Sequence, residues 1–416
     1  MPFSVDLSRA QALAQSIAFA DAIGAMPDAL ARLKSDYDSN TLPLLRVPQD
    51  QEAIDTARNF ADRVKQGASH IVLLGTGGSA LGAKVLQAIA SEGDGPRLIV
   101  LDNLDGLTQA RITQSLPLAT THVIAISKSG TTAETMAQCL ALLGAYEAAD
   151  VPDKGRFFAI TEPGDRPLRA LATKRGWPLL DHHTGVGGRF AVMTNVGTVP
   201  GFLLGLNMAD FLAGAQAALD PALAGNIDCD AAQGTALALA AMKSGLSQTV
   251  LLGYADRFEA LSFWYRQLWA ESLGKDGFGT TPINGLGPVD QHSQLQLYRG
   301  GPADKLYTVL TTDVKGQGPQ VPADLADDPA LAYLAGRTIG DLVDAEQRAT
   351  LDTLADVGRP VRHIHMPEVS AHAMGALMMH YMLETILTAH LLGIDAFDQP
   401  SVEDGKIRAK QYLADG

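Results

Sequence analysis

The chain has 416 residues, of which 46% are hydrophobic and 19% are charged, and this composition excludes a disordered protein. Its 32 basic and 46 acidic side chains give a formal net charge of −14, which argues against nucleic-acid binding and against a polybasic membrane-binding surface. The length is sufficient for roughly two or three domains.

The two cysteines, Cys139 and Cys229, do not form a C-x-x-C pair, so they provide no zinc or redox motif. We expect reduced cysteines and a cytoplasmic location. The first residues lack a basic region followed by an apolar one, and no run of about 18 uninterrupted apolar residues occurs. We therefore expect no signal peptide, no transmembrane helix and no membrane partner.

The first half of the chain predicts a parallel sheet preceded by helices. Residues 1–65 have the apolar spacing of helices, with a break near Leu42-Pro43. Helical patterns then alternate with short apolar segments, which we interpret as strands at Ile71–Leu74, Leu98–Leu101, Thr121–Ile126 and Arg156–Ile160. Such alternation is typical of a doubly wound α/β sheet.

The same pattern restarts in the second half. We expect strands at Gln248–Gly253, Tyr307–Leu310 and Val361–His365, and a long helix over Asp256–Leu273. The segment Ser370–Leu392 predicts a helix that is too apolar to lie on a surface. Helices within 196–212 would join the two halves.

The predicted fold class is therefore α/β, with two doubly wound parallel-sheet domains and helical extensions at both ends. We place the N-terminal extension at residues 1–50 and the first domain at 51–215. The second domain follows at 216–395, and a C-terminal helical arm at 396–416. Such boundaries are accurate to a few residues at best.

A glycine-rich turn, Gly75-Thr76-Gly77-Gly78-Ser79-Ala80-Leu81-Gly82, follows the first strand of the sheet. It resembles a dinucleotide-binding turn, but its glycine spacing differs from G-x-G-x-x-G, so the pattern is weak evidence for NAD. The turn could also lack a ligand altogether. We favour a third reading, in which Gly78 and Ser79 contact a phosphate, because the carboxyl ends of neighbouring parallel strands face one crevice.

The most informative segment is Ser127-Lys128-Ser129-Gly130-Thr131-Thr132, between a buried strand and a helix. Helix N-termini carry unpaired N–H groups and favour anions, and the four hydroxyl groups here can surround one. The segment lacks the Gly-Lys-Ser/Thr sequence of a nucleotide P-loop, so a phosphate on a small metabolite is favoured over a nucleotide. The alternative is an ordinary strand-to-helix connection with capping hydroxyls.

Two further segments carry charged candidates for catalysis. Arg189 follows three glycines in Gly185-Val186-Gly187-Gly188, and a permanently charged guanidinium suits an oxyanion. Taken singly, however, the segment favours a surface loop with a solvated arginine. Glu271 lies late in a predicted helix near aromatic residues, which could desolvate it into a general base. An exposed glutamate at a helix end is the alternative.

Two candidate acid–base groups follow. His292, after the Gly287-Pro288 loop, is easily placed as a proton donor or acceptor, or it could cap a helix start. Lys406 opens the last predicted helix, where a lysine is usually only solvated. The remaining histidines show no metal-binding pattern with carboxylates, so we expect neither a metal nor a cofactor.

These segments, in this order, resemble the metal-free glucose-6-phosphate isomerase family, and the match runs from about Leu73 to the C-terminus. The shared signatures are the Gly75 turn, Ser-Lys-Ser-Gly-Thr-Thr-x-Glu-Thr, Gly-Gly-Arg-Phe, Glu-Ser-x-Gly-Lys, Gln-His and Phe-Asp-Gln-Pro-x-Val-Glu-x-Gly-Lys. Each is modest singly, but together they are specific. The family fold is a pair of SIS (sugar isomerase) domains with a C-terminal helical arm.

The resemblance implies reversible isomerisation of glucose 6-phosphate and fructose 6-phosphate through ring opening and an enediol(ate). It implies that Glu271 is the catalytic base and that Arg189 stabilises the enediolate. It also implies that His292 and Lys406 open the sugar ring. The substrate and phosphate contacts would be Gly78, Ser79, Ser127, Lys128, Ser129, Thr131 and Thr132. The family histidine comes from the neighbouring subunit, so a homodimer is implied.

Two alternatives stay open at this stage. One is another aldose–ketose isomerase or epimerase on the same scaffold, for example one that also accepts mannose 6-phosphate. The other is a non-enzymatic sugar-phosphate sensor, which would keep the Ser127 loop without needing Glu271, His292 and Lys406.

Overall fold

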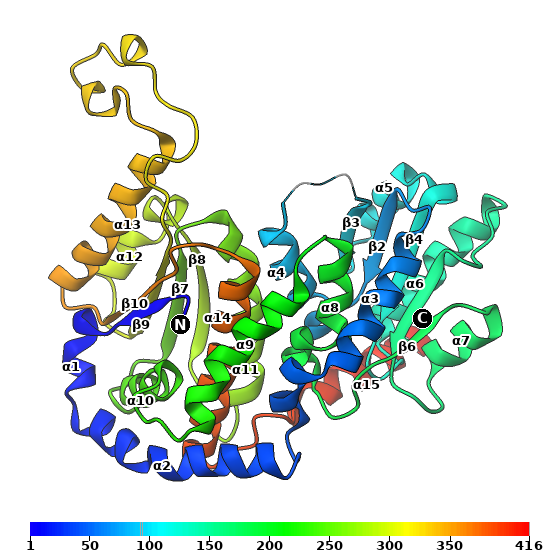
Figure 1. Ribbon diagram of the computed structural model, residues 1–416, viewed down its shortest axis with the longest axis horizontal. Coiled ribbons are helices and arrows are strands. Elements are labelled where there is room, and N and C mark those ends of the chain that lie inside the picture. The colour runs from blue at the N-terminus through cyan, green and yellow to red at the C-terminus, as the bar shows by residue number, and fades with distance from the viewer. Residues whose placement is uncertain (92, 94, 416) are drawn as a thin grey trace.

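The computed structural model describes residues 1–91, 93 and 95–415, and in them two β-sheets flanked by helices form two lobes (Figure 1). The fold class predicted from the sequence is confirmed. Among the described residues, no helix is both long enough and apolar enough to cross a bilayer.

The sheet of the first lobe is entirely parallel and has the strand order β3-β2-β4-β5-β6. Its strands are β2 (His70–Leu74), β3 (Arg97–Leu101), β4 (Thr121–Ile126), β5 (Phe157–Thr161) and β6 (Leu179–Asp181). The flanking helices are α3 (Gln51–Lys65), α4 (Leu81–Ile89), α5 (Gly106–Ser115), α6 (Ala133–Ala148), α7 (Pro167–Arg175) and α8 (Asn195–Leu203).

Side-chain alternation along the strands builds two cores, one on each face of this sheet. Ile124 and Ile126 of β4 point into the cluster that contains Phe60 of α3, whereas Val123 and Ala125 point into a second cluster. All six residues of β4 are buried, which explains its uninterrupted apolar sequence.

The sheet of the second lobe has the order β1-β10-β9-β7-β8, in which only β1 runs antiparallel to its neighbour. Its strands are β1 (Ser4–Asp6), β7 (Gln248–Gly253), β8 (Thr281–Leu286), β9 (Lys305–Thr311) and β10 (Val361–His365). The associated helices are α1 (Gln11–Ala14), α2 (Ile17–Asp38), α9 (Met208–Leu223), α10 (Asp230–Lys243), α11 (Glu259–Leu273), α12 (Leu295–Gly300), α13 (Ile339–Asp356) and α14 (Ala371–Leu392).

The segment expected to be a buried helix is confirmed as α14, which packs against α9, α10, α11 and α2. This central position explains why its sequence has no polar face. The domain boundaries stay a prediction, and α9 runs across the one placed at 215/216.

Three strands were absent from the sequence-based expectation. The N-terminal 65 residues are helical as predicted except for β1, which pairs with the edge of β10. The edge strands β6 and β8 were also missed. β8 contains Pro282, Asn284 and Gly285, which are residues depleted in strands.

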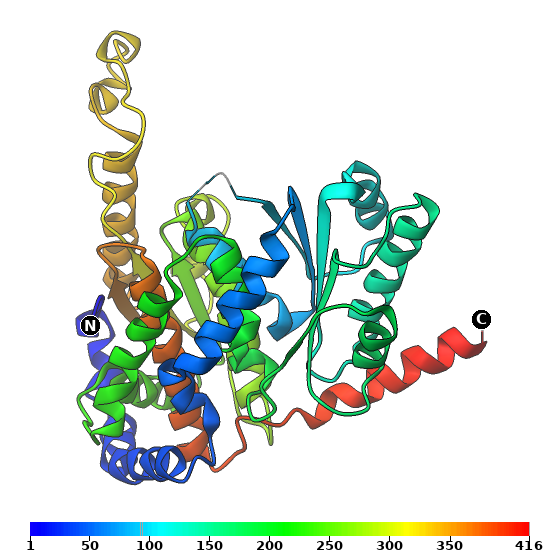
Figure 2. The same cartoon turned by 45° about the vertical axis from the view of Figure 1, so that its right-hand side comes forward.

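Two segments stand out from the lobes. Residues 313–338, drawn in yellow, project beyond the second sheet and lead into α13 (Figures 1 and 2). The C-terminal helix α15 (Glu403–Asp415), drawn in red, extends away from the first lobe (Figure 2), and all its residues are exposed.

Candidate active site

The candidate site lies at the carboxyl edge of the first sheet, between β2 and β4. The chain passes from β2 to β3 on one side and then returns to β4 on the other, so the strand order reverses at this point. Ligands of open α/β sheets bind at such a reversal. The Gly75 turn follows β2 and the Ser127 loop follows β4, so the topology brings both predicted phosphate-binding segments together.

The Ser127 loop is shaped by hydrogen bonds that its hydroxyl groups make within the loop. Ser127 Oγ accepts from the Gly130 N–H at 3.1 Å and lies 2.9 Å from Thr132 Oγ1. Ser129 Oγ accepts from both the backbone N–H and the hydroxyl of Thr131. Gly130 has a φ of 64°, which a residue with a side chain rarely adopts. The loop therefore forms a curled, hydroxyl-rich turn.

The helices that follow these two segments begin without side-chain caps. Ala80 precedes α4 and Thr132 precedes α6, and neither side chain accepts a hydrogen bond from the first turn of its helix. Thr132 instead bonds to Ser127. The N–H groups in the first turn of both helices can therefore donate hydrogen bonds to an anion.

Lys128 is the one cation within the Ser127 loop. Its Nζ lies 3.6 Å from the carboxylate of Glu162, which Arg166 also binds at 3.0 Å. The Glu162 N–H also donates to the Lys128 carbonyl. Since the Lys128–Glu162 pair is long and partly exposed, a bound phosphate can compete for the ammonium group.

The Gly75 turn packs directly against the segment that carries Arg189. A Cβ atom on Gly78 would lie 2.1 Å from the carbonyl carbon of Gly188, so only glycine fits there. Gly78 therefore serves close packing of two backbones. Ser79 lies in the 3-10 turn next to it and is partly exposed.

Arg189 is 4% exposed and connects four groups. Its Nη1 lies 2.9 Å from Glu271 Oε1 and donates to Gln399 Oε1, while Nη2 donates to the carbonyls of Ala396 and Asp398. Burial lowers the pKa of the Arg189 guanidinium, and the Glu271 carboxylate opposes this effect. Arg189 therefore orients the predicted base and also anchors the segment that leads to α15.

Glu271 lies near the C-terminal end of α11, and its side chain is 26% exposed. The environment expected from the sequence was aromatic, but Trp264 and Trp269 point into the core. The carboxylate is instead bound by Arg189 and by Gln267 Nε2, at 2.9 Å. Two donors that fix both oxygens position Glu271 more firmly than aromatic contacts would.

Sequence reasoning missed Gln267 and Gln399. Gln267 lies four residues before Glu271, one turn earlier on the same helix face, so i,i+4 spacing was the available signal. A Cβ atom on Gly77 would lie 2.9 Å from Gln267 Nε2, which shows that α11 also contacts the Gly75 turn. Gln399 belongs to the Phe-Asp-Gln-Pro signature, but its contact with Arg189 arises only through the tertiary fold.

His292 is not part of this cluster within one chain. It ends the 3-10 turn Val289–Gln291, beyond the end of β8, and it is exposed. Gln291 fixes the turn by donating to Tyr254 and Thr350. The imidazole has no hydrogen-bond partner among the residues that the structure describes.

Lys406 also lies apart from Glu271. It is on α15, it is exposed, and its Nζ binds Glu403 at 2.7 Å. The start of the arm is nevertheless anchored at the site, since Lys275 pairs with Asp398 at 2.6 Å and Arg189 holds Gln399. In the described part of the chain, no group of three or more His, Cys, Asp or Glu side chains is arranged to hold a metal ion.

Comparisons with known proteins show what the chain as a whole is similar to. A model of the phosphoglucose isomerase family matches residues 45–415. The chain is 36% identical over 374 residues to a glucose-6-phosphate isomerase of Rubrobacter xylanophilus, covering 87% of each chain. It is 36% identical over 387 residues to a glucose-6-phosphate isomerase of Thermus thermophilus, covering 92% of each.

A solved structure extends the likeness to the whole fold. A hypothetical protein from Thermus thermophilus superposes with a TM-score of 0.90 at 32% sequence identity. The superposition covers 99% of this chain and 100% of that one.

Proposed function

This chain belongs to the phosphoglucose isomerase family, and we propose that it interconverts D-glucose 6-phosphate and D-fructose 6-phosphate through ring opening and a cis-enediol(ate). The observation that carries the proposal is the position of Glu271. Its carboxylate is fixed by Arg189 and Gln267, and both of these residues lie against the Gly75 turn, which leads into the uncapped start of α4.

The phosphate would be bound first, far from the reacting carbons. It would accept hydrogen bonds from the N–H groups at the starts of α4 and α6 and would pair with the Lys128 ammonium. The hydroxyl donors would be those of Ser79, Ser127, Ser129, Thr131 and Thr132. Binding energy from this remote group would align the sugar with Glu271. In this arrangement the first lobe supplies the anchor and α11 of the second lobe supplies the carboxylate.

Glu271 would then move one proton between C2 and C1 of the open-chain sugar. A single carboxylate can serve both carbons because they are adjacent. The positive charge of Arg189 would stabilise the enediolate oxygen, and such a preorganised donor contributes about 3–4 kcal/mol in a dry site. The Arg189–Glu271 pair would also hold the base in a fixed orientation.

Ring opening would use His292 from a second copy of the chain. Trp269 Nε1 donates to Thr280 Oγ1, which places the Glu271 end of α11 at the start of β8. His292 lies beyond the far end of β8, whose six residues span ~20 Å. Because β8 separates the two groups within one chain, we infer that a homodimer completes each site.

The surface beside His292 supports association with a second copy. The projection of residues 313–338 starts at the same edge of the second sheet, and it exposes Leu325 and Tyr333. Val289, in the His292 turn itself, is also exposed. Exposed apolar groups on a protruding segment are typical of interfaces between chains.

Lys406 would assist ring opening after the arm closes over the substrate. Gln399 is fixed to Arg189, and Lys406 follows seven residues later, about 10 Å further along a helix. A rotation about Gln399-Pro400 would carry the ammonium towards the crevice. The cytoplasmic location expected from the sequence forms part of the same proposal, since the substrate is a phosphorylated metabolite.

The test is a coupled assay of the purified protein with fructose 6-phosphate and added EDTA. Formation of glucose 6-phosphate that resists the chelator is the expected result. Absence of product from folded protein, with and without added divalent metal, would contradict the proposal.

A further inference from the structure

The segment that follows β5 supports the loop that carries Lys128. The N–H of Glu162 donates to the Lys128 carbonyl at 3.2 Å, and the N–H of Leu168 donates to the Gly130 carbonyl at 3.1 Å. A Cβ atom on Gly130 would lie 2.8 Å from Arg166 Cβ, so glycine allows the two segments to approach this closely. The segment after β5 therefore places its side chains directly beside the proposed phosphate anchor.

The carboxylate of Glu162 lies between two cations that it binds unequally. Its side chain is 11% exposed, and its Oε2 accepts a hydrogen bond from Arg166 Nη2 at 3.0 Å. Its Oε1 lies 3.6 Å from Lys128 Nζ, which is beyond hydrogen-bond distance. Arg166 is therefore the closer partner, and Lys128 is the one that can leave more easily.

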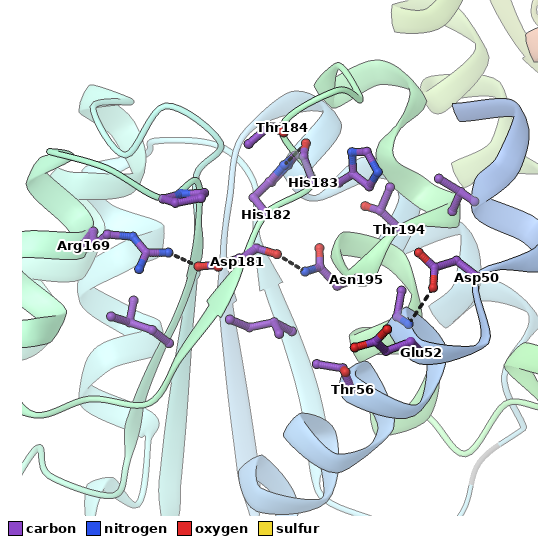
Figure 3. A pocket seen from close by; sticks show the side chains of 15 residues that line it. Asp50, Glu52, Thr56, Arg169, Asp181, His182, His183, Thr184, Thr194 and Asn195 are labelled. Carbon is purple, nitrogen blue, oxygen red and sulfur yellow. Dashed lines mark hydrogen bonds and ion pairs between the residues drawn. The ribbon is translucent and has the colours of Figure 1, made fainter. Parts of the chain in front are cut away.

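The other basic groups nearby are engaged elsewhere. Figure 3 shows the Arg169 guanidinium directed at Asp181, and Arg169 Nε donates to the Glu162 carbonyl rather than to its carboxylate. Burial lowers the pKa of His182 to about 4, so its ring supplies no positive charge at neutral pH. In the part of the chain that the structure describes, the Glu162 carboxylate therefore has only the two cationic partners named above.

Lys128 has room to turn away from Glu162. Its side chain is 33% exposed, and it borders a cavity of about 640 Å³ together with Gly187 and Ala396. Gly187 lies in the loop that carries Arg189, and the Ala396 carbonyl is bound by that arginine. Since a lysine stem is flexible, the ammonium group can change partners without a rearrangement of the backbone.

Removing a cation from a nearly buried carboxylate is costly when no other cation remains. Arg166 lowers this cost, because it stays on Glu162 when Lys128 leaves. The free energy of the Lys128–Glu162 pair is then subtracted from the free energy of phosphate binding. A carboxylate that never contacts the substrate can in this way set the affinity for it.

We propose that Glu162 is a positioning residue, which holds Lys128 away from the phosphate in the free protein and so lowers the affinity for the sugar phosphate. Arg166 remains on Glu162 while the Lys128 ammonium transfers to the phosphate. This inference rests on the proposed function, because it takes the Ser127 loop as the phosphate anchor.

The test measures binding of sorbitol 6-phosphate by calorimetry, with sorbitol as the phosphate-free comparison. Sorbitol 6-phosphate has no carbonyl group and cannot be isomerised. Glu162→Gln should bind it about threefold more tightly than the wild type, since Lys128 loses the competing carboxylate. Glu147→Gln is the matched control, at an exposed glutamate of the same lobe that is paired with Arg175, and should bind as the wild type does.

Two further variants separate the effect of Lys128 from a general effect of charge. In a Lys128→Gln background, Glu162→Gln should leave the affinity unchanged, because no ammonium group remains to be released. Arg166→Gln should weaken binding about twofold, since Glu162 then depends on Lys128 alone. Damage to the fold would weaken binding in both the Glu162 and the Arg166 variants, whereas the proposal requires opposite directions.

Unchanged or weaker binding in folded Glu162→Gln, or tighter binding in Arg166→Gln, would overturn the proposal. Equal tightening in Glu147→Gln, or the same tightening in the Lys128→Gln background, would also overturn it. If the predicted shifts occur but the coupled assay shows no isomerisation, only the proposed reaction is contradicted. Binding of sorbitol 6-phosphate no tighter than that of sorbitol would refute the phosphate anchor and, with it, both proposals.

Discussion

Arg189 and Glu271 come from opposite lobes of the molecule and form an ion pair, with 2.9 Å between Nη1 and Oε1. The same guanidinium binds the carbonyls of Ala396 and Asp398 through Nη2. One buried cation therefore connects the first lobe, the helix with the predicted base and the C-terminal segment. Several consequences of this connection can be measured.

Replacing Arg189 by lysine should reduce kcat about 100-fold, since an ammonium group cannot reproduce the planar fork that binds four partners. The C-terminal segment should also loosen, because the carbonyls of Ala396 and Asp398 lose their donor. Steady-state kinetics and limited proteolysis within residues 395–402 measure the two effects. Arg348→Lys, at an exposed arginine paired with Asp344, is the control. An unchanged kcat in Arg189→Lys would show that the guanidinium is not needed for the reaction.

Gly78→Ala should destabilise the protein by about 1–3 kcal/mol, because the new methyl group would lie 2.1 Å from the backbone of Gly188. Urea denaturation measures the change. Gly24→Ala is the matched control. Gly24 lies within α2 with nothing within 4 Å of its would-be Cβ, so alanine should stabilise there by about 0.5–1 kcal/mol. Equal stability of the Gly78 variant and the wild type would show that the two backbones separate easily.

His182 should make stability depend on pH in the acid range. Its pKa is lowered to about 4 in the folded protein, below its ordinary value of 6.5, so the unfolded chain binds the proton more tightly. The contribution is complete above pH 6.5 and is lost as the pH falls towards 4, amounting to ~3 kcal/mol. The free energy of unfolding of His182→Gln should therefore fall less between pH 6.5 and 4 than that of the wild type. Parallel pH profiles would contradict a buried, neutral imidazole.

The composite site predicts complementation between two inactive variants. Glu271→Gln and His292→Ala should each be nearly inactive, but their mixed dimer keeps one site with both wild-type groups. Co-expression in equal amounts should then restore about a quarter of the wild-type activity. If the mixture remains as inactive as its components, His292 does not act across a subunit interface.

The fold was largely predictable because strongly apolar segments have few alternatives. Thr121–Ile126 is buried on both faces and was correctly assigned, as was the apolar helix that became α14. β8 was missed because an edge strand needs no continuous apolar sequence, and Pro282 and Gly285 obscure its pattern. β1 has only three residues and exists through its pairing with β10.

The local sequence points to individual candidate residues of the site but not to how they are arranged. The small and hydroxylated residues around Ser127 predict an anion-binding loop from local sequence alone. The contacts of Arg189 with Glu271 and Gln399 depend on how the lobes pack, which no local spacing records. The roles assigned to the individual site residues, His292 and Lys406 included, stay predictions.

The most direct test follows hydrogen exchange at the reacting carbons in D₂O. Wild-type protein should convert fructose 6-phosphate to glucose 6-phosphate with deuterium incorporated at C2. Glu271→Gln should slow both exchange and conversion about 1,000-fold while keeping its unfolding transition. Near-normal turnover and exchange in this folded variant would contradict the assignment of Glu271 as the base.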